Sequence, residues 1–252
     1  MGSGAPSRDY SDRAAGAAPE AWATKISETN PDMWLRLADS GVAVGGTFAD
    51  ASGNGHDATL EALSGTVVQG AASLVPADSN ASLDLRSGTA RLAVTDTSFI
   101  TSGGHTFAVA VKIDAPPTSV GSIISHGGLV NGTGRREFQS QVNSSGNLIV
   151  TWYKNDGTYL TWTTTYSICD GSTRLLVFVI NPGGCVIYID GVPVSDIQSR
   201  EGQITATDPL TIAAMPAGDG RYLSAVFDEV IVWDRVMHAP EVADIYRCFT
   251  GV

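Results

Sequence analysis

The chain lacks the features that mark several common classes of protein. Its three cysteines are odd in number and have no metal-ligand spacing, so we expect no disulfide framework and predict buried thiols at Cys169, Cys185 and Cys248. Only 15 residues are Lys or Arg, whereas 26 are Asp or Glu, which gives a formal net charge of −11. This balance argues against nucleic acid as a partner, because phosphate binding needs clustered basic residues.

Long apolar segments and a secretory leader are also missing. No stretch approaches the roughly 18 consecutive apolar residues of a membrane-spanning helix. No basic and apolar leader precedes the first strand-like segment. We therefore expect no membrane insertion, and we expect a protein that is made and used without the standard signal-peptide route.

Patterns that would indicate catalysis are scarce. A β-sandwich glycosidase needs two carboxylates about 5–10 Å apart on one strand face. The chain has seven Glu residues, and none of them lies two or five positions from another carboxylate in a convincing strand. The histidines show neither His-x-His nor His-Glu-x-x-His spacing, and no Gly-x-Ser-x-Gly turn occurs. We predict that the protein is not an enzyme, with a glycosidase as the least favoured alternative.

What the chain does contain is a long series of short strand-like segments. From Met33 onward, about a dozen such segments recur at intervals of about 8–12 residues, which is typical of a β-sandwich. Residues 107–113 alternate between apolar and smaller or polar side chains, and residues 175–180 are continuously apolar. A length of 252 residues suits one such domain with a tail. The sequence therefore predicts an all-β, antiparallel β-sandwich over residues 31–252.

The two ends of the chain differ from this strand-rich body. Residues 1–30 begin with a Gly-, Ser- and Ala-rich stretch typical of a flexible arm, and Trp22 and Ile26 then have helical spacing. We expect this N-terminal arm, with its short helix, to anchor the protein to an assembly partner. The alternative is a tail that lies on its own domain. A second short helix is predicted after Pro240.

Several segments, taken in their order along the chain, resemble the concanavalin A-like, laminin-G-like jelly roll. They are residues 34–37, 50–56, 80–84, 122–127, 188–192 and 227–230, followed by the terminal helix. Arg86 and Ser87 stand where the family often has Gly, and Ala213 replaces another common Gly. The resemblance covers the whole domain, which looks like the jelly rolls of tailed-bacteriophage minor tail and capsid-surface proteins.

The resemblance also implies one structural Ca²⁺ that ties an early turn to the last strand. Its ligands would be the side chains of Asp50 and Asp228, with Asn54, His56 and nearby residues offering backbone oxygens. Calcium prefers such oxygen donors. Asp228 and Glu229 are adjacent on a strand, so we expect their side chains to point to opposite faces. The alternative is a purely structural turn, in which Gly53 and Gly55 adopt positive φ and Asp50 caps backbone amides.

An aromatic cluster surrounds the hairpin predicted at residues 155–157. The predicted carbohydrate-binding residues are Trp152, Tyr159, Trp162, Asn155 and Asp156. The rings offer flat apolar faces to a sugar, and the amide and carboxylate reach its hydroxyls. Strand alternation puts Trp152 and Tyr153 on opposite faces, so at most half of the cluster shares one surface. The alternative is ordinary core packing or a subunit contact.

These observations favour a virion structural and adhesion protein, either a capsid decoration or a minor tail protein, with no enzymatic activity. In this hypothesis residues 1–30 dock on capsid or tail proteins of the same virion, and the jelly roll faces outward on the virion surface. A host-surface glycan and further copies of the chain are additional partners, and assembly takes place in the host cytoplasm. The alternative is a free carbohydrate-binding module that recognises a polysaccharide.

Overall fold

The computed structural model describes residues 22–76, 78–100, 103–127, 138–153, 158–181, 184–198, 209–215 and 220–251. Fourteen strands and two helices lie in this part of the chain. The elements are α1 (Trp22–Glu28), β1 (Met33–Leu35), β2 (Thr47–Phe48), β3 (Ala58–Ala71), β4 (Ser82–Val94), β5 (His105–Lys112), β6 (Gly121–His126), β7 (Phe138–Val142), β8 (Asn147–Tyr153), β9 (Tyr159–Ser167), β10 (Thr173–Asn181), β11 (Gly184–Ile189), β12 (Val192–Gln198), β13 (Leu210–Ile212), β14 (Val226–Trp233) and α2 (Ala239–Thr250). The predicted antiparallel sandwich is confirmed.

The strands follow one hydrogen-bonded path that is folded into two layers. The path runs β12-β11-β10-β5-β14-β4-β13-β6-β7-β8-β9, with β1 added to β14 and β2–β3 added to β4. Strand β4 belongs to both layers, because Leu83 and Asp84 pair with β14 whereas residues 92–94 pair with β13. We call β12, β11, β10, β5, β14 and β1 the first sheet, and β13 and β6–β9 the second sheet.

The main hydrophobic core lies between the two sheets. Phe138 of the second sheet stacks on Phe107 of the first at a centroid distance of 5.5 Å and meets Phe178 at 5.0 Å. All three rings are fully buried. Removing such a side chain from water stabilises the fold by about 1.5–3 kcal/mol, so these contacts fix how the two sheets face each other.

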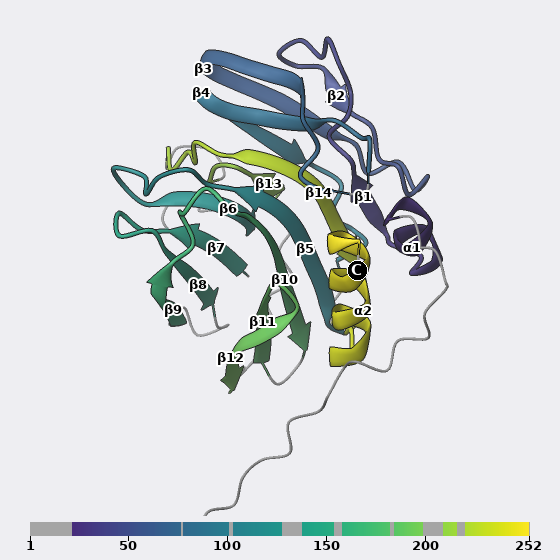
Figure 1. Ribbon diagram of the computed structural model, residues 1–252, viewed down its shortest axis with the longest axis vertical. Coiled ribbons are helices and arrows are strands. Elements are labelled where there is room, and N and C mark those ends of the chain that lie inside the picture. Colours follow the sequence, from purple (N-terminus) through teal and green to yellow (C-terminus); the bar gives the residue numbers. More distant parts are fainter. Residues whose placement is uncertain are drawn as a thin grey trace, which may run out of the picture.

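A second core lies on the outer face of the first sheet, beneath both helices. Figure 1 shows α1 and α2 on this side of the sandwich and β7–β9 on the opposite side. Helix α2, predicted after Pro240, buries Val242, Ile245 and Phe249 against the sheet. Its first turn is closed by Glu241, whose carboxylate accepts the His238 N–H at 2.8 Å. Neither helix of the described chain is long and apolar enough to cross a membrane.

Helix α1 is part of this second core. Trp22 and Ile26 are both buried there, and the Trp22 ring meets Phe249 of α2 edge-on at 5.6 Å. Just after the helix, Thr29 Oγ1 accepts the indole N–H of Trp233 at 2.8 Å. The domain boundary predicted at residue 30 therefore falls inside the packed unit, because the apolar face of α1 covers sheet residues that need shielding from water. Residues 1–21 of the predicted arm lie outside the described residues.

We predict that Trp22→Ala lowers the free energy of unfolding by about 3–5 kcal/mol, since it removes a large buried ring from the second core. Ser27→Ala, on the exposed side of the same helix, is the matched control and should change it by less than about 0.5 kcal/mol. Urea denaturation of both variants measures the difference. Equal free energies of unfolding for Trp22→Ala and the wild type would show that α1 does not contribute to the stability of the second core.

Candidate functional site

The backbone of β14 contains a bulge at its acidic pair. Asp228 stands opposite Ala110 of β5 and Ile231 stands opposite Ala108, so two residues of β14 face one residue of β5. Glu229, inside this bulge, has a left-handed φ of 51°. The bulge resets the strand alternation and turns both carboxylates toward the second core. The expectation that Asp228 and Glu229 point to opposite faces is therefore wrong.

Asp228 is held by the segment that precedes β4. Its Oδ2 accepts the Leu74 N–H at 2.9 Å and the Ser73 hydroxyl at 3.2 Å. Burial raises the pKa of Asp228 to about 8, and the neighbouring Glu229 carboxylate acts in the same direction. The side chain is fully enclosed. Asp228 is therefore mainly a neutral acid at pH 7.

Glu229 connects β14 to β1 and to the segment before β4. Its carboxylate accepts the indole N–H of Trp34, and it also faces Arg36 Nε at 3.4 Å and Asn80 Nδ2 at 3.5 Å. Burial raises the pKa of Glu229, although the hydrogen bond from Trp34 and the charge of Arg36 oppose this effect. Arg36 forms a second ion pair with Asp78, so its charge is compensated locally.

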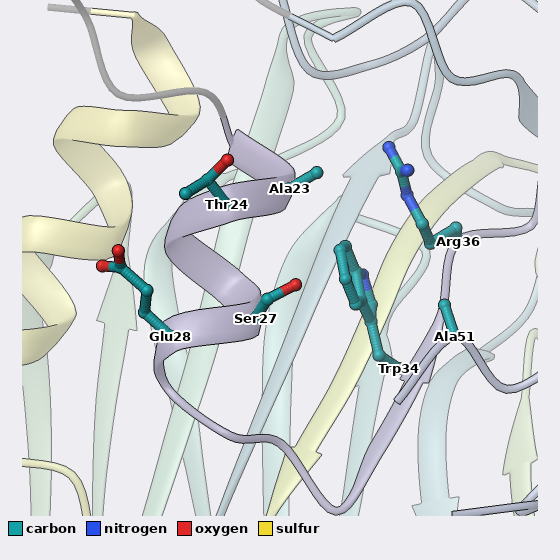
Figure 2. A pocket seen from close by; sticks show the side chains of 7 residues that line it. All are labelled: Ala23, Thr24, Ser27, Glu28, Trp34, Arg36 and Ala51. Carbon is teal, nitrogen blue, oxygen red and sulfur yellow. The ribbon is translucent and has the colours of Figure 1, made fainter. Parts of the chain in front are cut away.

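A surface groove of about 660 Å³ lies directly above Trp34, between α1, β1 and the turn after β2. Its lining residues are Ala23, Thr24, Ser27, Glu28, Trp34, Arg36 and Ala51. Figure 2 shows Ala23 and Ser27 of α1 on one side of the Trp34 ring and Arg36 on the other, whereas Glu28 points away. The guanidinium carbon of Arg36 is 5.0 Å from the centre of the Trp34 ring. The groove has a ligand-sized volume, but Trp34 is itself buried and offers little surface.

Asp50, predicted to bind calcium, organises its own turn instead. One carboxylate oxygen accepts the backbone N–H groups of Trp34 at 2.8 Å and Ser52 at 2.9 Å. The other accepts the N–H of His56 at 3.0 Å and the Ser52 hydroxyl at 2.7 Å. Burial acts to raise the pKa of Asp50, but these donors outweigh it and leave the pKa below its ordinary value.

The other implied calcium ligands do not complete a site. The Asn54 amide donates to the Asp32 carbonyl at 3.0 Å, and the His56 ring contacts the tilted ring of Phe99 at a centroid distance of 4.1 Å. Asp228 is fully enclosed and accepts the Leu74 N–H and the Ser73 hydroxyl, as described above. No group of three or more His, Cys, Asp or Glu side chains in the described ranges is placed to hold a metal ion. Both implied side-chain ligands, Asp50 and Asp228, thus accept hydrogen bonds from the protein itself, and the geometry favours the alternative of a structural turn, with positive φ at Gly53 and Gly55.

The second sheet differs from β14 in charge, because β6, β7, β8 and β9 contain no Asp, Glu, Lys or Arg. On its outer face, hydroxyl and amide side chains stand opposite one another from strand to strand. This row consists of Thr211, Ser125, Gln139, Thr151 and Thr161. Its first members are buried, but Thr161 and Thr163 of β9 are exposed. The chain thus presents an uncharged polar surface at β9, which we call the neutral face.

The predicted carbohydrate-binding residues are divided between the two faces of the second sheet. Trp152 is only 2% exposed and lies in the main core, with its ring 6.1 Å from that of Phe138. Trp162 is half-buried against the same core. Tyr159 is 63% exposed and belongs to the neutral face. Trp152 is therefore a core residue in this structure, because its strand position points inward, and Asn155 and Asp156 lie outside the described residues.

Sequence reasoning missed two features of these regions. Thr161 and Thr163 were not among the predicted residues, although four consecutive strand-like segments without charge were visible in an acidic chain. Glu229, Trp34 and Arg36 were also missed as a connected group. An Asp-Glu pair inside an otherwise apolar strand was the available signal, since buried carboxylates need partners.

We predict that stability falls as the pH rises from about 5 to about 8, because native Asp228 keeps its proton to about pH 8 whereas the unfolded side chain loses it near 3.8. Asp228→Asn should flatten this slope in urea titrations at several pH values. Asp84→Asn is the control. The hydrogen bond from Arg86 lowers the pKa of Asp84, so loss of this carboxylate changes the pH dependence of stability only at acidic pH. A wild-type slope retained in Asp228→Asn would contradict the assignment.

We also predict that neither added Ca²⁺ nor a chelator shifts the melting temperature. Asp50→Ala should instead lower the free energy of unfolding by at least about 2 kcal/mol in either condition, because four donors lose their acceptor. Thermal melts with and without Ca²⁺ measure both effects. A calcium-dependent melting temperature that disappears in Asp50→Ala would restore the metal site.

Comparisons with known proteins place this fold in a family. Residues 86–243 match the model of the concanavalin A-like lectin/glucanases superfamily, in its Laminin_G_3 form. A search of curated proteins found no match.

Solved structures share the architecture at low sequence identity. The binding domain of Paraclostridial Mosquitocidal Protein 1 has a TM-score of 0.64 at 14% identity, over 88% of this chain and 52% of that one. The Trypanosoma rangeli sialidase in complex with sialic acid has a TM-score of 0.63 at 13% identity, over 85% and 32%. The Botulinum Neurotoxin Type G Receptor Binding Domain has a TM-score of 0.59 at 14% identity, over 86% and 51%. The chain thus spans about half or less of each of these proteins, and it belongs to the concanavalin A-like lectin/glucanase superfamily.

Proposed function

We propose that this chain is a non-enzymatic attachment module whose neutral face binds an uncharged glycan. The observation that carries the proposal is the exposed Tyr159 ring beside the hydroxyls of Thr161 and Thr163, on strands without a single charged side chain. A tyrosine ring gives a flat apolar surface with a polar tip, which suits the mixed surface of a sugar. Hydroxyls and amides both donate and accept hydrogen bonds, as sugar hydroxyls do.

The charge of the protein narrows the class of glycan. A net charge of −11 repels acidic polysaccharides, and no basic residue of β6–β9 offsets that repulsion. A neutral glycan meets no such barrier. The acidic pair of β14 lies beneath α1, away from the neutral face, so it offers no catalytic carboxylate there. This arrangement supports binding without hydrolysis.

We further propose that the module is displayed on a bacteriophage particle, as a capsid decoration or minor tail protein, and that the glycan belongs to the host surface. The ordered sequence resemblance to phage jelly rolls supports this setting. Two of the structurally similar proteins are described as a binding domain and a receptor binding domain, so this architecture is used for attachment elsewhere. The alternative is a free carbohydrate-binding module.

We predict that Tyr159→Ala weakens binding to a neutral glycan at least about tenfold, whereas Tyr159→Phe, which keeps the ring, stays within about threefold. A glycan array of neutral and acidic polysaccharides identifies the ligand, and calorimetry then compares the variants. Thermal melts confirm that both are folded, as expected for an exposed position. Equal binding by Tyr159→Ala and the wild type, or a preference for acidic glycans, would contradict the proposal.

The particle setting has its own test, which is electron microscopy of purified particles with a gold label on the C-terminus. Label over the head identifies a decoration protein, and label on the tail identifies a minor tail protein. Absence of the chain from particles would favour the free carbohydrate-binding module.

A further inference from the structure

The exposed side chains of the neutral face lie along a single strand. Tyr159, Thr161 and Thr163 of β9 are exposed, whereas Leu160 and Trp162, which alternate with them, are half-buried against the main core. Outward side chains that are two positions apart on a strand are separated by about 6.6–6.8 Å, so these three span about 13 Å. The strand thus presents a row of one aromatic ring and two hydroxyls, which we call the β9 strip.

The β9 strip is narrow, because it is bounded along both of its long sides. On β8, Thr151 stands opposite Thr161 but is buried, and Gln139 on the next strand is buried as well. On the other side, β12 of the first sheet packs near β9. A molecule that binds to the neutral face therefore extends along β9 and not across the second sheet.

Hydrogen bonds hold the backbone at one end of the strip. The pairing of β9 with β8 becomes irregular after Thr163. Thr164, the next residue, is buried, and its hydroxyl accepts the Leu148 N–H at 3.0 Å and donates to the Tyr166 carbonyl at 2.7 Å. The Asn147 amide donates to the Thr164 carbonyl at 2.7 Å. These bonds fix the backbone beside Thr163, so a ligand meets a surface that is already ordered.

We propose that the β9 strip binds an internal segment of a linear, β-1,4-linked neutral polysaccharide laid along the strand, an inference that rests on the proposed glycan binding. Three exposed side chains in a row offer contacts to consecutive sugar units, whereas a terminal sugar is typically recognised in a concave site that encloses it. The Tyr159 ring stacks on one unit, and the hydroxyls of Thr161 and Thr163 bond to the units that follow. A β-1,4-linked chain is extended and stays on such a row, whereas an α-1,4-linked chain coils away from it.

This geometry makes affinity depend on the length of the glycan. Each hydrogen bond to a sugar hydroxyl contributes little net free energy by itself. A short glycan on the Tyr159 ring does not reach Thr163, whereas a longer one contacts the whole strip. Affinity should therefore rise with the number of sugar units until the strip is covered and should then level off.

The test is titration of the full chain with β-1,4-linked oligomers of glucose, mannose and N-acetylglucosamine, each as the disaccharide, tetrasaccharide and hexasaccharide. Calorimetry measures the longer oligomers and NMR titration the disaccharides. In at least one series the hexasaccharide should bind at least about tenfold more tightly than the disaccharide. The α-1,4-linked hexasaccharide of glucose is the comparison, and it should bind at least about tenfold more weakly than that hexasaccharide.

A variant at the end of the strip tests the direction of the glycan. Thr163→Val keeps the branched shape of the side chain and removes its hydroxyl. It should lower the ratio of hexasaccharide affinity to disaccharide affinity about three- to tenfold. Thr66→Val, at an exposed position of β3, is the matched control and should keep the wild-type ratio. Thermal melts establish that both variants are folded, since both positions are exposed.

The outcomes separate this proposal from the proposed function. Equal affinity for the disaccharide and the hexasaccharide, equally tight binding of the α-1,4-linked hexasaccharide, or a wild-type ratio in Thr163→Val would overturn the inference and leave glycan binding standing. Binding of neutral glycans on the array but of none of the three β-1,4-linked series would do the same. Absence of binding to every neutral glycan would overturn the proposed function itself.

Discussion

The bulge in β14 is the constraint on which the helix-covered side of the molecule depends. A regular strand would place either Asp228 or Glu229 in the main core between the sheets, among hydrophobic side chains. The left-handed conformation of Glu229 costs about 1–3 kcal/mol, but it brings both carboxyl groups to one face. There the indole N–H of Trp34 and the backbone N–H of Leu74 meet them. One local distortion thus joins β14 to β1 and to the segment before β4.

The groove above Trp34 and the neutral face differ in how far their side chains are already engaged. Beneath the groove, Arg36 is compensated by Asp78 and Glu229, and Trp34 is fixed by its hydrogen bond. These groups are committed to holding the structure together, so little of their bonding capacity remains for a ligand. On the second sheet, the exposed hydroxyls of β9 stand on a rigid core of aromatic rings. A recognition surface works best on such a support, because binding then orders few new groups.

The fold could be predicted from the sequence, but the directions of individual side chains could not. Alternation, turn residues and the ordered motifs predicted the antiparallel sandwich, and Pro240 marked the start of the last helix. Alternation also separates Trp152 from Tyr153, but it does not say which of the two points inward, since that depends on the partner sheet. The left-handed Glu229 had no sequence signal, because such conformations favour Gly or Asn. The helical spacing of Trp22 and Ile26 predicted α1 without revealing what it covers.

The absence of charge on β6–β9 has two consequences that belong together. A neutral polar surface in an acidic protein favours neutral ligands. An anionic ligand is repelled by the net negative charge, and a cationic ligand loses water of hydration at this surface without finding an anionic partner there. The same absence removes the charged residues, such as Lys, that commonly protect an edge strand. A charged residue that prevented strand pairing at the exposed side of β9 would lie within the neutral face itself. Keeping that face uncharged for recognition therefore means that the neighbouring strand β12, rather than a charged side chain, limits access to β9.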